Sequence, residues 1–170
     1  PHRVCSCDGR RVREDAMSAQ QFLLLRDAYC EQIGQAAPPL EPDASGTMAF
    51  HQIIRAYAVT FTYAPRLSVD DVFIMMDIGP MAQAAGTPGW HTLMQCNTLM
   101  FGKNSPVLGL SEAGHLMIQK VHPLCSANGQ DLKALVDGLV NWADLWHERA
   151  MHSPQGDPVN RVPFVPGQRV

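Results

Sequence analysis

The sequence lacks the features that mark several common classes of protein. It has no glycine-rich phosphate loop of the GxGxxG or GxxxxGK[ST] type and no G-x-S-x-G nucleophile elbow. No apolar run approaches the roughly 20 residues that span a bilayer, and the first eleven residues have no apolar core of signal-peptide length. The net charge of −3 comes without a basic stripe. We therefore expect a cytoplasmic protein that neither inserts into a membrane nor binds nucleic acid.

Residues that could carry out catalysis are few and poorly spaced. The acidic pair Asp70-Asp71 directly precedes an apolar stretch, where it suits a turn better than acid–base chemistry. Cys96 and His91 could form a thiol nucleophile with its base, but at five residues apart on one helix they point in different directions. We interpret Cys96 as a small buried hydrophobic residue.

The sequence also offers little to a metal ion. His2, Cys5 and Cys7 lie close together, but a single Cys-x-Cys is a weak signal beside paired Cys-x-x-Cys motifs. His147 and His152 are typical of a solvated helix end, where a cation interacts favourably with the helix dipole. We expect ordinary free thiols and neither a metal nor a cofactor.

Composition divides the 170 residues into three parts. Residues 1–16 are rich in Arg and acidic residues and poor in apolar ones, so we predict a flexible N-terminal lead-in. Residues 17–152 have the length and apolar content of one domain. Residues 153–170 hold four prolines, and we predict a flexible C-terminal tail there.

The first half of the predicted domain indicates one helix followed by strands. Ser18 suits an N-cap for a helix from Ala19 to about Gly34. Met48 to Ile54 and Arg55 to Tyr63 are rich in β-branched and aromatic residues, which predicts two strands. Val72 to Ile78 is almost continuously apolar, which predicts a third strand that is buried on both faces or lies along a partner.

The second half indicates a helix, a hairpin and a last helix. The first helix is expected over 89–101, and the hairpin turns around Glu112-Ala-Gly114. Asn128 can cap a helix from Gln130 to about Met151. The order α-β-β-β-α-β-β-α predicts an α+β fold, with helices packed on a twisted antiparallel sheet.

Several short motifs of the second half occur in an order that resembles a known family. They are Leu93-Met-Gln-Cys-Asn97, Pro106-Val-Leu-Gly-Leu110, Glu112-Ala-Gly-His-Leu-Met-Ile118 and a helix that ends in Trp142-Ala-Asp-Leu-Trp146. The chain looks like the class I chaperones of bacterial type III secretion, the CesT-like family. Their members show a Leu-Leu-x-x-Asn helix, a Leu-Gly-Leu strand, a glycine turn and a last helix with Trp near its end. The resemblance covers about residues 18–150, and the long tail departs from compact members.

This resemblance implies a function without catalysis. The chain would be a small cytoplasmic homodimer that binds the N-terminal region of one or a few secreted effectors in an extended form. Such binding keeps the effector soluble and secretion-competent, and helps to deliver it to the secretion ATPase.

The helix expected near residue 90 is the predicted dimer interface. No formal charge occurs from Trp90 to Phe101, so this helix should be covered on most sides. A place inside a monomer, or a role in binding a ligand, are the alternatives. The residues that we assign to the interface are Trp90, Leu93, Met94, Asn97 and Met100.

The effector surface is predicted on the first helix and the first strands. An extended client can add a strand to an exposed sheet edge and place apolar side chains in pockets, and the nine methionines would adapt to varied partners. Ordinary core packing is the alternative for each residue. The assigned residues are Phe22, Leu25, Tyr29, Phe50, Tyr57, Val59 and Phe61.

A second hypothesis belongs to another class of protein. A small cytoplasmic α+β enzyme or ligand-binding domain would place Cys96 or the histidines in a closed pocket. It predicts loss of activity in Cys96→Ala, whereas a chaperone should keep its client binding.

Overall fold

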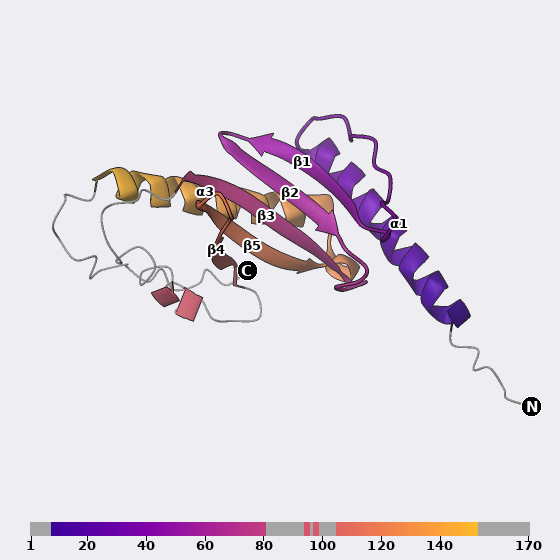
Figure 1. Ribbon diagram of the computed structural model, residues 1–170. Coiled ribbons are helices and arrows are strands. Elements are labelled where there is room, and N and C mark those ends of the chain that lie inside the picture. Colours follow the sequence, from indigo (N-terminus) through magenta and orange to yellow (C-terminus); the bar gives the residue numbers. More distant parts are fainter. Residues whose placement is uncertain (1–7, 81–93, 96, 99–104, 153–170) are drawn as a thin grey trace, which may run out of the picture.

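The computed structural model describes residues 8–80, 94–95, 97–98 and 105–152. Two long helices and a five-stranded sheet make up these residues (Figure 1). In chain order the elements are α1 (Asp8–Gln32), β1 (Met48–Ile54), β2 (Tyr57–Tyr63), β3 (Asp71–Pro80), β4 (Val107–Leu110), β5 (His115–Pro123), the short 3-10 helix η1 (Leu124–Ser126) and α3 (Gly129–His152). No described helix combines the length and the hydropathy that crossing a bilayer requires.

The sheet confirms the predicted α+β class. Its strands run in the order β1-β2-β3-β5-β4, and every neighbouring pair is antiparallel. The strands at the two edges are therefore β1 and β4. Within the helix expected over 89–101, residues 94–95 and 97–98 are helical, and the other positions lie outside the described residues.

The strands form where the apolar pattern predicts them. In β1 and β2 alternate residues are buried, because successive side chains of a strand point to opposite faces. Strand β3 also alternates, with Val72, Ile74, Met76 and Ile78 buried and the residues between them partly exposed. The apolar run Val72 to Ile78 is therefore not buried on both faces within the described chain. The first of its two predicted alternatives, burial on both faces, is wrong.

Both helices pack against one face of the sheet, which we call the inner face; the opposite face is the outer face. Figure 1 shows α3 passing behind the strands as drawn. Aromatic rings join α1 to the inner face: the ring centroids of Phe22 and Phe50 are 5.9 Å apart, those of Tyr29 and Phe61 5.0 Å, and those of Phe50 and Phe61 4.6 Å. Each such buried ring stabilises the fold by roughly 1.5–3 kcal/mol.

Helix α1 begins earlier than predicted and ends as predicted. It begins at Asp8, so Ser18 is a buried residue within the helix and not its N-cap. At the other end Gly34 has a φ of 68°. The amide of Gln35 donates to the carbonyl of Cys30 at 2.9 Å, and the amide of Gly34 donates to that of Glu31 at 3.1 Å. These two bonds form a Schellman motif, which glycine favours because it adopts a positive φ without strain.

Helix α3 begins at the predicted cap. The amide of Asp131 donates to Oδ1 of Asn128 at 2.8 Å, which satisfies one of the unpaired N–H groups of the first turn. The next residue, Gly129, lies against α1. A Cβ at this position would stand 2.5 Å from the backbone carbonyl atoms of Ala28, so the close approach of the two helices requires glycine.

Candidate functional site

The seven residues predicted to bind the effector lie in the core. Because the helices cover the face on which the aromatic residues of β1 and β2 stand, these side chains fill the space between helix and sheet themselves. This arrangement corrects the prediction of an open groove between α1 and the first strands. Each of the seven is at most 5% exposed: Phe22, Leu25, Tyr29, Phe50, Tyr57, Val59 and Phe61.

Strand β1 presents an unpaired edge. Its seven residues pair with β2 on one side, and no other described strand lies on the opposite side. An edge strand exposes N–H and C=O groups that can pair with another chain. On the outer face of this strand the side chains of His51 and Ile53 are exposed. A ring nitrogen of His51 lies 2.9 Å from the hydroxyl of Thr60 on β2.

The opposite edge, β4, is held by a side chain. The amide nitrogen of Asn97 donates to the carbonyl of Leu108, and the backbone amide of Leu108 donates to the side-chain oxygen of Asn97, both at 2.8 Å. In this way Asn97 takes the place that a residue of a further strand would occupy. The edge of β4 is therefore blocked at Leu108, whereas that of β1 is open among the described residues.

Only two of the five predicted dimer residues fall within the described chain. Met94 is 65% exposed and Asn97 is half-buried against β4. Trp90, Leu93 and Met100 lie outside the described residues. Sequence reasoning assigned Asn97 to the dimer interface and missed its bonds to Leu108, because these two residues are joined only by the fold.

A polar cluster fastens α3 to the hairpin of β1 and β2. The guanidinium of Arg55 pairs with the carboxylate of Asp144, and the hydroxyl of Tyr57 donates to Oδ1 of the same carboxylate at 2.7 Å. Burial, followed by the hydrogen bond to Asp144, raises the pKa of Tyr57 to about 12. Arg55 has a φ of 56°, a conformation that is uncommon outside glycine and that belongs here to the hairpin turn. The cluster positions structural elements.

One histidine of β5 faces the inner side of the sheet. His122 is paired in register with the buried Val72, and its Nε2 is buried and has no hydrogen-bond partner among the described residues. Burial and the neighbouring charge of Lys120 lower the pKa of His122. No local pattern predicts this environment, because His122 lies near the end of a strand whose burial depends on the packing of α1 and α3.

The described residues do not bring a catalytic or metal site together. Asp71 accepts a hydrogen bond from the hydroxyl of Ser68 at 2.7 Å, and the carbonyl of Asp70 accepts one from the amide of Leu124 at 2.7 Å, so both contribute to the turn before β3. Over the part of the chain that is described, no group of three His, Cys, Asp or Glu side chains could hold a metal ion. The remaining candidates lie outside it or have no described side chain: His2, Cys5, Cys7, His91, Cys96, His147 and His152.

Several solved structures share this fold. The chain has a TM-score of 0.58 and 15% identity to a chain of the ExsC–ExsE complex, covering 82% of this chain and 98% of that one. For the HopA1–SchA chaperone–effector complex the TM-score is 0.57 and the identity 21%, with 78% and 97% covered. For the Yersinia pestis type III secretion chaperone SycH, bound to a stable fragment of YscM2, the TM-score is 0.54 and the identity 16%. This likeness covers 71% of this chain and 95% of that one.

The family follows from the sequence itself. No curated protein matches the sequence. A family model, however, matches residues 29–147, which is more than half of the chain, and includes the last turn of α1, the whole sheet and most of α3. The chain belongs to the Tir chaperone protein (CesT) family.

Proposed function

We propose that this protein binds the N-terminal region of a cognate type III secretion effector in an extended form. Bound in this way the effector stays soluble and competent for secretion. Membership of the CesT family and the chaperone–effector complexes among its structural neighbours support this role. The observation that carries the mode of binding is the unpaired edge of β1.

Strand addition explains how one surface can hold an unfolded client. An extended segment next to β1 would form main-chain hydrogen bonds that depend little on the client's sequence. Every second side chain of that segment would lie beside the exposed residues Ala49, His51 and Ile53. Because β4 is held by Asn97 at Leu108, β1 is the better of the two edges for this addition.

The protein acts, in this proposal, as a homodimer in the bacterial cytoplasm and has no enzymatic activity. Its dimer interface is the helical segment around Met94 and Asn97. The absence of formal charge from Trp90 to Phe101 and the 65% exposure of Met94 support this assignment. Delivery of the effector to the secretion ATPase would follow from the same complex.

Co-expression with the effector encoded beside its gene tests the proposal. We expect a stable complex of two chaperone chains with one effector, measured by size-exclusion chromatography with light scattering. The complex should survive truncation of the effector to its N-terminal region and be lost when that region is removed. If no effector from the same genome binds through its N-terminal region, the proposed function is wrong.

Hydrogen–deuterium exchange tests the mode of binding. Client binding should slow the exchange of backbone amides in Met48–Ile54, because strand addition pairs them with another chain. The amide of Leu108 serves as an internal control, since it already donates to Asn97 at 2.8 Å. Unchanged exchange in β1 on binding would show that the client does not add a strand there.

The dimer assignment has its own test. Leu93→Asp places a charge on the predicted interface and should give monomers or insoluble protein. Gln95→Asp is the matched control, because Gln95 is exposed on the same helical segment and should keep the dimer mass. An unchanged dimer mass for Leu93→Asp would remove this interface assignment.

A further inference from the structure

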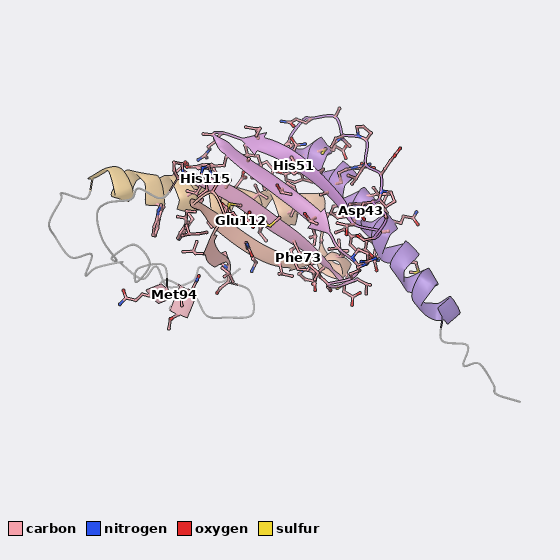
Figure 2. All side chains as sticks on the ribbon, in the orientation of Figure 1. Asp43, His51, Phe73, Met94, Glu112 and His115 are labelled. Carbon is pink, nitrogen blue, oxygen red and sulfur yellow. The ribbon has the colours of Figure 1, made fainter. Side chains whose placement is uncertain are left out.

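Three rows of residues in cross-strand register form the middle of the outer face of the sheet, and the pair Asp71 and Pro123 continues this face at one end. The first row is Ala49, Thr62, Phe73 and Val121; the second is His51, Thr60, Met75, Gln119 and Val107; the third is Ile53, Ala58, Asp77, Met117 and Gly109. No described helix covers them (Figure 1), and Figure 2 labels His51 and Phe73 at two of these positions.

These rows are almost free of charge. Asp77 is their only residue with a formal charge at neutral pH, and its carboxylate oxygens lie 2.9 and 3.1 Å from Nδ1 of His115. A solvated face of an antiparallel sheet ordinarily carries polar and charged side chains. The three rows contain no lysine, arginine or glutamate, so this face has the composition of a contact surface.

The apolar side chains of the rows remain accessible. Ile53 is 66% exposed, Val107 56% and Val121 48%. Between them Phe73 and Met75 are only partly buried. They lie on four of the five strands, from the β1 edge to the β4 edge, and the uncharged polar side chains of Thr60, Thr62 and Gln119 stand between them.

We propose that the outer face is the second part of the client site and binds an uncharged apolar segment of the effector next to the strand added at β1. This inference rests on the proposed function. A strand next to β1 places every second side chain on the outer face, beside Ala49, His51 and Ile53. The client chain that leaves this strand can then cross the three rows without a break in contact.

The chemistry of the rows defines the segment. Charged client side chains would find no opposite charge, because Asp77 is already paired with His115. Aliphatic and aromatic side chains would contact Phe73, Met75 and Val121, and the flexible thioether of Met75 can adapt to different shapes. The hydroxyl of Thr60 offers a polar contact for a client hydroxyl or amide.

A charge placed in the middle of the face tests this proposal. Gln119 is exposed and stands in the second row between Met75 and Val107. Gln119→Glu should leave the fold intact and weaken client binding roughly tenfold or more, because a bound client would bury an unpaired carboxylate. Gln35→Glu is the matched control: the same substitution at an exposed site after α1, with affinity expected to stay unchanged.

The probe is the N-terminal effector fragment that co-purifies with the wild-type protein, with its Kd measured by calorimetry. Wild-type affinity in Gln119→Glu would overturn the inference and leave the proposed function standing. A change of oligomeric mass in Gln119→Glu without client would also overturn it, since the face would then join two copies of the chain. If the wild type binds no fragment, both proposals fail. Circular dichroism spectra and urea midpoints that are equal in Gln119→Glu and Gln35→Glu establish that a change in folding does not cause the loss of client affinity.

Discussion

The two hydrogen bonds between Asn97 and Leu108 are the clearest case in which one side chain holds an element of this fold. The side-chain amide donates to one backbone group and accepts from the other, each at 2.8 Å. Replacement of Asn97 by alanine removes both bonds without adding bulk. We therefore expect Asn97→Ala to loosen the edge strand β4.

The size of the effect follows from the exposure of the site. A typical hydrogen bond contributes a net ~0.5–1.5 kcal/mol, so two bonds contribute roughly 1–3 kcal/mol. Asn97 is half-buried, and water can partly replace it at Leu108, which favours the lower half of that range. The higher helix propensity of alanine offsets roughly 0.5 kcal/mol. The free energy of unfolding should fall by about 0.5–1.5 kcal/mol.

Urea unfolding at fixed protein concentration measures this change. With a slope of about 2 kcal/mol per molar urea, the midpoint should move by roughly 0.3–0.8 M. Hydrogen exchange should show that the amide of Leu108 loses protection in Asn97→Ala. Gln95→Ala is the control, because Gln95 is exposed on the same helical segment and its loss should change stability by less than about 0.5 kcal/mol.

A second variant separates the two bonds. In Asn97→Asp the side chain can still accept from the amide of Leu108, but it places a carboxylate oxygen against the carbonyl and loses the donor. We expect it to be at least as destabilising as Asn97→Ala. If Asn97→Ala and Gln95→Ala have the same urea midpoint and the amide of Leu108 stays protected in Asn97→Ala, the hydrogen bonds do not hold β4 and the reasoning is refuted.

Three further predictions concern packing and titration. Gly129→Ala should lower the free energy of unfolding by about 1–3 kcal/mol, because its Cβ would meet the α1 backbone at 2.5 Å. Gly138→Ala, whose Cβ would meet no atom of another described element within 4 Å, should raise it by roughly 1 kcal/mol, and thermal melts of both variants measure the two changes. The pKa of His122 is lowered, so the folded protein binds fewer protons than the unfolded chain and its stability should fall as the pH drops below 6.5. If the urea midpoint of His122→Leu varies with pH as strongly as that of the wild type, this explanation is wrong. Asp144→Ala should bring the pKa of Tyr57 down from about 12, though burial keeps it above 10.0, as measured by ultraviolet titration.

Local patterns were enough to predict most of the elements. The β-branched and aromatic residues of Met48–Ile54 identified β1 with its observed bounds, and Asn128 identified the start of α3, since a cap acts within one turn of helix. The start of α1 was missed. Residues 8–16 have no apolar face, so nothing in their pattern marked them as part of the helix that begins at Asp8.

The faces and edges of the sheet could not be predicted in the same way. Alternation correctly put Tyr57, Val59 and Phe61 on one side of their strand, but it does not say which side the helices cover. That choice depends on how α1 and α3 pack, and it placed these residues in the core. The contact between Asn97 and Leu108, and the uncharged outer face, likewise join residues that are distant in the chain. They exist because five strands are in register, and no short stretch of sequence contains that register.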